Sequence, residues 1–281
     1  MAVIQALKRT PSTVLGHPIV FVAVLLYGIV VTLLQIPQLI YQQPDSLVTA
    51  LVPWLVLGVS IVLYPFLWGG LVGIANDAAS GHSPTIGRFA AHGRSFYLSI
   101  LGAYLLLTGV VIALVIPFTM AMIAGGFAFV LTDGSAVGLA ILALLGLVFL
   151  AIYLGVMFVV QFFLHAIVIE GTRAIEGLKR SLEVVRSNLL SAFGHALVVA
   201  AGGFLVAIPY IGVQFWLFPP TMPGEDLTLP DPGVAAGAFG VSTLFGAIVG
   251  VFLLVFTVQF YRAVIGLEGA GARGTGTTND W

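Results

Sequence analysis

Six long apolar stretches alternate with short polar connections along the chain, at about residues 18–40, 47–75, 96–124, 137–169, 189–217 and 236–267. A helix needs about 20 predominantly apolar residues to cross the hydrocarbon core of a bilayer, and each stretch is at least that long. The pattern therefore predicts an all-α fold, a polytopic transmembrane helical bundle of six spans.

The composition also favours burial in lipid. Hydrophobic residues make up 60% of the chain, charged residues make up only 7%, and the mean hydropathy is +1.14. About a quarter of the residues in an ordinary soluble domain are charged. The connections are too short for a second domain, so we expect a single six-helix transmembrane domain over residues 1–268. Residues 269–281 are rich in Gly and Thr and are expected to form a disordered cytoplasmic tail.

The distribution of basic residues predicts the orientation of the bundle. All ten lysines and arginines lie in four segments: before the first span, between spans two and three, between spans four and five, and at the end of the sixth. The other three connections contain no basic residue. Because Lys and Arg are enriched in cytoplasmic loops, we expect both termini in the cytoplasm and a multi-pass protein of the cell (plasma) membrane.

The sequence shows no catalytic or metal-binding motif. It contains no cysteine, no H-E-x-x-H, no G-x-S-x-G, no G-x-G-x-x-G and no Walker loop. Its five histidines lack metal-ligand spacing, and His82 and His92 are expected to face water in a cytoplasmic connection. The basic residues are too few and too dispersed for nucleic-acid binding. We expect no enzyme, no cofactor and no metal, with membrane lipids as partners and a protein partner at the cytoplasmic face as an open alternative.

The odd-numbered spans share a spacing. Each approaches its outer end with an Ile-Pro pair, and 29 positions separate Lys8 from Pro37, Arg88 from Pro117 and Arg180 from Pro209. This spacing favours three pseudo-repeated hairpins, each with a cytoplasmic amphipathic lead-in helix, because internal repeats are frequent in membrane folds. An accidental match between prolines near helix ends is the alternative. The first lead-in, residues 3–15, is expected to be limited by Pro11.

The connection between spans four and five predicts an interfacial helix over about residues 171–187. On a helix, Ala174, Ile175, Leu178, Leu182 and Val185 share one face and the charged residues lie on the other. Such a helix lies along the membrane surface, where its basic residues attract anionic headgroups. The predicted lipid- or partner-binding residues are Arg173, Lys179, Arg180 and Arg186. A helix that merely anchors the bundle is the alternative.

This region resembles the signature of the glycerophosphoryl diester phosphodiesterase membrane-domain family. The run His165-Ala-Ile-Val-Ile-Glu170 is followed by Ala174-Ile-Glu-Gly-Leu178-Lys-Arg180-Ser181, and the matching residues are Glu170, Gly177, Leu178, Arg180 and Ser181. The resemblance covers some 30 residues and implies a six-helix membrane protein. The function of stand-alone members is largely unassigned, and the family name comes from fusion to a soluble phosphodiesterase domain. The resemblance therefore implies no phosphodiesterase activity.

A set of polar residues near the inner ends of spans four, five and six is the candidate intramembrane site: Gln161, His165, Glu170, His195, Gln259 and Arg262. Polar groups inside a membrane are costly and often functional. If these spans meet, the set forms a cluster in the inner third of the membrane. In the alternative, each His and Gln bonds a nearby carbonyl, and Glu170 and Arg262 pair or snorkel at the interface.

Two functions are therefore compatible with the sequence. The first is a non-enzymatic integral membrane protein that organises the membrane or binds a lipid or partner through its cytoplasmic interfacial helix. The second is a small transporter or channel subunit that uses the polar cluster, which requires a water-accessible path to His165 or His195.

Overall fold

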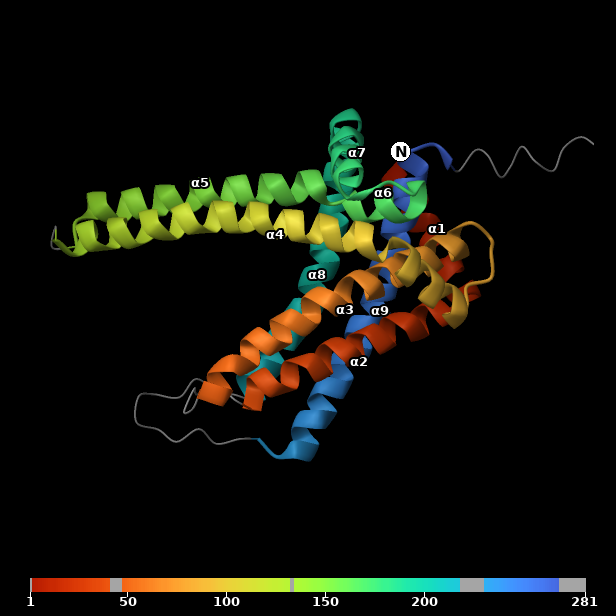
Figure 1. Cartoon of the computed structure of the whole chain (residues 1–281), viewed down its shortest axis with the longest axis horizontal. Helices are drawn as coiled ribbons and strands as arrows, with labels where there is room; N and C mark the ends of the chain where they lie inside the picture. The colour runs from red at the N-terminus through yellow and green to blue at the C-terminus, as the bar shows by residue number, and fades with distance from the viewer. Residues whose placement is uncertain (1, 41–46, 132–133, 218–229, 268–281) are drawn as a thin grey trace, which may run out of the picture. The chain divides into compact units, whose positions relative to one another are not determined.

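The computed structural model describes residues 2–40, 47–131, 134–217 and 230–267. Its regular structure over these residues is helical, which confirms the all-α prediction (Figure 1). Six helical segments within the described residues are long and apolar enough to cross a membrane. In chain order the elements are α1 Ala2–Gly16, α2 Pro18–Ile40, α3 Leu47–Ala79, α4 Ile86–Leu131, α5 Ala136–Val160, α6 Phe163–Glu170, α7 Ala174–Ser187, α8 Leu189–Leu217 and α9 Pro232–Val264.

Two helices extend further than the sequence indicated. α4 begins at Ile86 instead of at about 96 and has 46 residues. At about 1.5 Å per residue that length is more than twice the thickness of a hydrocarbon core of about 30 Å, so α4 is longer than a single span requires. α1 continues through Pro11, which was wrongly expected to limit it. Packing offsets the backbone donor that Pro11 removes, because Ala6 and Thr10 are fully buried.

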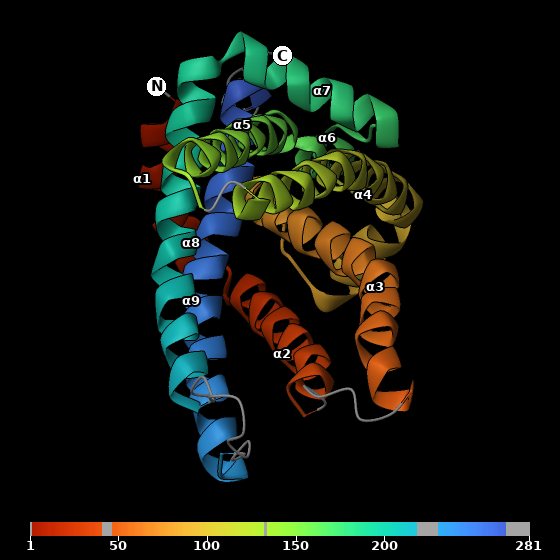
Figure 2. The same cartoon turned by 90° about the vertical axis from the view of Figure 1, so that its left-hand side faces the viewer.

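The chain divides into two compact units, residues 1–97 with 188–281, and residues 98–187. In the first unit α9 is the central helix, and it contacts α1, α2, α3 and α8 (Figure 2). Its C-terminal turns are closely packed, since Val255, Phe256, Val258, Phe260 and Tyr261 are all completely buried. The apolar surface that α9 loses is the main packing contribution of this unit.

Polar side chains join the helices of the first unit. Thr32 of α2 bonds Thr243 of α9 over 3.0 Å, and Tyr210 of α8 donates to the amide oxygen of Gln35 over 2.7 Å. Such interhelical hydrogen bonds contribute about 0.6 kcal/mol on average within membranes. They fix the pairing of helices whose apolar surfaces alone would pack in many ways.

Glycines let α3 approach the start of α4. A Cβ built on Gly73 would overlap the imidazole of His92, and one built on Gly93 would lie 2.8 Å from the carbonyl oxygen of Phe66. Small residues are typical of such close helix contacts. The contact brings the charged end of α3 beside α4, which matters for the site described below.

The second unit comprises the rest of α4 with α5, α6 and α7. α4 and α5 lie side by side (Figure 1), with the rings of Phe118 and Phe149 stacked at a centroid distance of 3.9 Å. α7 contacts both α5 and α6. Of the predicted lead-ins, residues 3–15 are helical, the segment before 96 is helical from Ile86, and residues 171–187 are helical from Ala174. The three-hairpin repeat stays a prediction, and the predicted tail of residues 269–281 lies outside the described residues.

The substitution Gly73→Ala tests the close approach of α3 and α4. Because the added methyl group meets ring atoms next to the His92 backbone, we expect a loss of about 1–3 kcal/mol in the free energy of unfolding. Gly58→Ala in the same helix is the matched control, since nothing lies within 4 Å of its built Cβ. Alanine is the better helix former by about 1 kcal/mol, so the control is expected to be neutral or stabilising. Unfolding in detergent followed by circular dichroism measures both, and equal effects would contradict the contact.

Candidate functional site

The fourth span is interrupted after α5. The helix ends at Val160, Gln161 is its C-cap, and a new helix begins at Phe163. An interruption frees backbone groups that lipid cannot satisfy. Ser181 of α7 satisfies two of them, because its hydroxyl accepts from the Phe162 N–H over 3.0 Å and donates to the Val159 carbonyl over 2.7 Å. Since Ser181 is fully buried, this contact fixes α7 against the end of the span.

A left-handed glycine, the ion pairs of Arg180 and a close approach at Gly177 complete the corner between α6 and α7. Gly171 ends α6 in the left-handed conformation with φ 72°, a geometry that favours glycine. The Arg180 guanidinium donates to Glu170 over 3.0 Å and to Glu183 over 3.3 Å. A Cβ on Gly177 would lie 2.6 Å from Cγ1 of Ile167. The residues that resemble a family signature thus hold this corner together.

The four predicted binding residues of α7 differ in their surroundings. Arg173, Lys179 and Arg186 are exposed, and none of the three forms an ion pair with another described residue. Arg180 is half-buried and serves in the corner just described. The buried residues of α7 are Gly177, Ser181, Val184 and Val185, whereas Ile175, expected on the apolar face, is 57% exposed. The inward face is therefore turned relative to the predicted one.

The predicted polar cluster is divided between the two units. Gln161, His165 and Glu170 belong to residues 98–187, where Gln161 donates to the Phe158 carbonyl over 2.9 Å and Glu170 pairs with Arg180. His165 is buried, with its ring edge-on to Phe162. Gln161 and Glu170 thus bond residues of their own unit.

The other three residues of the set lie on or against α9 in the first unit. His195 is buried, bonds the Thr257 hydroxyl over 3.1 Å and stacks on Phe260. Gln259 donates to Thr13 of α1 over 2.7 Å, and Arg262 donates to Asn76 of α3 over 2.7 Å. Each of these groups links two helices. A single cluster of all six residues stays a prediction.

Sequence reasoning missed a buried carboxylate at the end of α3. Asp77 is 4% exposed and accepts two hydrogen bonds of 2.7 Å from Arg88 and one interaction of 3.0 Å with Nε2 of His92. The expectation that His92 faces water is therefore wrong, because α4 starts early enough to carry it against α3. Asp77 lies at the end of span two, 11 positions before Arg88, and that spacing is the signal that could have indicated an internal pair.

The arrangement joins α3, α4 and α9 through charge. Asn76 and Asp77 are consecutive residues, and they hold Arg262 and Arg88 respectively. A bidentate pair between Arg and a carboxylate is among the strongest hydrogen-bonded contacts in proteins. Within the described residues, no group of three or more His, Asp or Glu side chains is placed to hold a metal ion.

Fold and site together define a multi-pass membrane protein with six helices able to span a bilayer. The chain belongs to the DUF7847 family, described as a domain of unknown function, whose model matches residues 1–264. No curated protein and no solved structure matches the chain. The matching family does not bear the name of the glycerophosphoryl diester phosphodiesterase membrane domain. The family and the six apolar helices together support an integral membrane protein of unassigned role.

The substitution Ser181→Ala tests the repair of the interrupted span. It leaves the Phe162 N–H and the Val159 carbonyl without their partner, so we expect a loss of about 1–3 kcal/mol in the free energy of unfolding. Ser187→Ala removes an exposed hydroxyl of the same helix that bonds the Glu183 carbonyl, and should change stability by less than about 0.5 kcal/mol. Chemical or thermal unfolding in detergent distinguishes them. Equal stability of both variants would show that the Ser181 contact has no importance.

The two partners of the buried ion pair should differ when each is removed. Arg88→Ala leaves the carboxylate of Asp77, which is 6% exposed, without its main partner, whereas Asp77→Ala leaves a guanidinium that is 46% exposed and reaches water. We expect the midpoint of thermal unfolding to fall further for Arg88→Ala. The double variant should recover part of that loss, because no buried charge is then left unpaired. A double variant less stable than both single variants would contradict this account.

Proposed function

We propose that this chain is a non-enzymatic integral membrane protein that binds anionic lipid headgroups through α7. The observation behind the proposal is the difference between the packed face and the exposed face of that helix. Its inward face is fixed by Ser181, Gly177 and Arg180, while Arg173, Lys179 and Arg186 are exposed and form no ion pair with described residues. A rigidly held helix presents these cations without a further ordering cost on binding.

The position of α7 supports a lipid ligand. In the chain the helix lies between two apolar spans, and the side chain of its Ile175 is 57% exposed. Exposed apolar and basic side chains together are typical of helices in the membrane interface. The acids Glu176 and Glu183 are also exposed. The attraction between α7 and anionic headgroups therefore depends on where each basic side chain lies more than on the net charge of the helix.

The orientation and location belong to the same proposal. Under the positive-inside rule, α7 and both termini face the cytoplasm of a cell whose plasma membrane contains the six spans. The relationship to the glycerophosphoryl diester phosphodiesterase membrane-domain family, based on Glu170, Gly177, Leu178, Arg180 and Ser181, is likewise proposed, without any catalytic activity.

The transport alternative receives less support from the side-chain surroundings. It requires water to reach His165 or His195, and these residues are 7% and 3% exposed. His195 packs against the apolar rings of both Phe256 and Phe260. We therefore base the proposed function on α7.

The double variant Lys179→Glu and Arg186→Glu tests the proposal and leaves Arg180 in its structural place. Each basic residue near an anionic surface contributes about 1 kcal/mol, so reversing two should lower the preference for an anionic lipid by at least about tenfold. The measurement is the ratio of phosphatidylglycerol to phosphatidylcholine that stays bound to the purified protein, determined by mass spectrometry. Lys179→Arg with Arg186→Lys is the matched control, because it keeps both charges.

An unchanged ratio in the reversed variant would overturn headgroup binding by α7. Loss of a co-purifying protein with an unchanged lipid ratio would instead support a protein partner at this helix. Circular dichroism of each variant shows whether the helical bundle is intact.

A further inference from the structure

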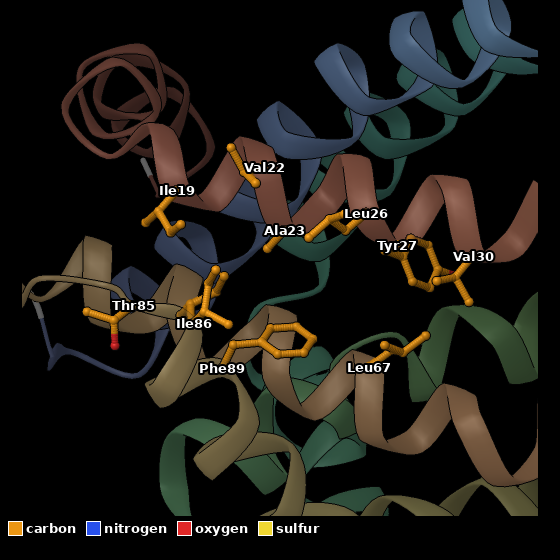
Figure 3. A pocket seen from close by; sticks show the side chains of 11 residues that line it. Ile19, Val22, Ala23, Leu26, Tyr27, Val30, Leu67, Thr85, Ile86 and Phe89 are labelled. Atoms are coloured by element: carbon orange, nitrogen blue, oxygen red, sulfur yellow. The ribbon is translucent and has the colours of Figure 1, made fainter.

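A groove opens between α2, α3 and the first turn of α4, all within the first unit (Figure 3). Its cavity volume is about 130 Å³, and its lining is almost entirely apolar. Ile19, Ala23 and Leu26 form one wall, and Leu67, Ile86 and Phe89 face them from the other side.

The size and lining of the groove fit a hydrocarbon chain. Its α2 wall runs from Ile19 to Val30, a rise of about 16 Å along the helix axis. Apolar cavities of about 150 Å³ stay dry and accept benzene-sized hydrocarbon groups. A void beside a spanning helix would also leave its lining without dispersion contacts on one side. The physical expectation is therefore an apolar occupant, and the bilayer supplies acyl chains.

Arg88 does not line the groove, but it is the chain neighbour of the lining residue Phe89 and has a donor left for another ligand. Thr85 and Ile86 line one end of the groove, and Arg88 follows them on α4. The Nε and Nη2 groups of Arg88 donate to Asp77, whereas its Nη1 makes no hydrogen bond with any described residue. The Arg88 side chain is 46% exposed. The Thr85 hydroxyl accepts from the Arg88 backbone N–H, and its own proton is available to an anion.

The charge around this end is complementary to an anionic headgroup. The described residues of the first unit include five basic side chains, Lys8, Arg9, Arg88, Arg94 and Arg262, and two acids, Asp77 and Asp231. Asp231 caps the start of α9, at the opposite end of that helix from Arg262. α1 lies beside the Arg262 end, because its Thr13 bonds Gln259. Among the described residues of this unit, positive charge therefore exceeds negative charge on the side where Arg88 lies.

We infer that this groove binds one anionic membrane lipid, with an acyl chain between α2 and α3 and its phosphate beside Arg88 and Thr85. The site is separate from α7 and goes beyond the proposed function, because it recognises a single lipid molecule by chain and headgroup together. The apolar chain excludes water from the groove, and the phosphate accepts from Nη1 of Arg88 without displacing Asp77.

Photo-cross-linking of the full chain in vesicles tests the site. The probe is a phosphatidylglycerol with a diazirine at the end of one acyl chain, and the same chain on phosphatidylcholine is the comparison. Adducts located by peptide mass spectrometry should concentrate on residues 19–30 and around Leu67. The anionic probe should give several-fold more of them, in line with about 1 kcal/mol for each basic residue near the headgroup. Adducts spread evenly over all spans would overturn the inference, as would equal labelling by the two probes.

A substitution that fills the groove with a larger side chain gives a second, independent test by the same cross-linking measurement. Ala23→Phe places a ring between the walls and should remove most of the adducts in residues 19–30 while labelling of α5 is unchanged. Ile29→Phe is the matched control, because Ile29 is an exposed residue of the same helix that does not line the groove. Undiminished labelling of a folded Ala23→Phe protein would contradict the site. If Ala23→Phe does not fold, the distribution of adducts on the unmodified chain decides.

The α7 variants separate this inference from the proposed function. Lys179→Glu with Arg186→Glu should leave labelling of residues 19–30 unchanged. A loss there would show that the groove does not hold lipid independently of α7.

Discussion

Hydrocarbon offers no hydrogen bonds to a helix, so every freed backbone group in a span needs a partner from the protein itself. The fourth span shows the consequence, because its interruption at Gln161 and Phe162 is satisfied by Ser181 of α7. Without that hydroxyl, two backbone groups would lose their partner. The position of α7 therefore follows from the interruption, and Glu170, Arg180 and Gly177 complete the same corner.

The same constraint governs the charged residues of the first unit. A carboxylate as buried as Asp77 is tolerated because Arg88 and His92 both bond it. Their approach depends on Gly73, where any side chain would meet His92. One end of α3 thus combines a small residue, an acid and a contact to α9 through Asn76 and Arg262. Charge pairing and close helix contact support each other there.

The sequence predicted the helical class and the approximate spans, because hydrophobic length is a direct consequence of bilayer thickness. It also indicated that residues 171–187 form a distinct helix. It could not predict which face of that helix turns inward, since Ser181 is buried for its hydrogen bonds and not for its hydrophobicity. Asp77 was missed for a related reason. Its partner Arg88 lies in the next helix, and only the early start of α4 brings His92 against α3.

A basic residue that contributes to the predicted membrane orientation can also have a structural role. Arg180 and Arg88 both contribute to the charge asymmetry, yet each holds a carboxylate of its own unit. They differ in whether the carboxylates leave a guanidinium donor without a hydrogen bond. Arg180 divides its donors between Glu170 and Glu183. Nη1 of Arg88 makes no hydrogen bond with a described residue, and the neighbouring Phe89 lines an apolar groove. A cation already oriented by a buried acid loses little freedom when an anion binds, which is the arrangement that favours selection of one headgroup over nonspecific attraction to the membrane surface.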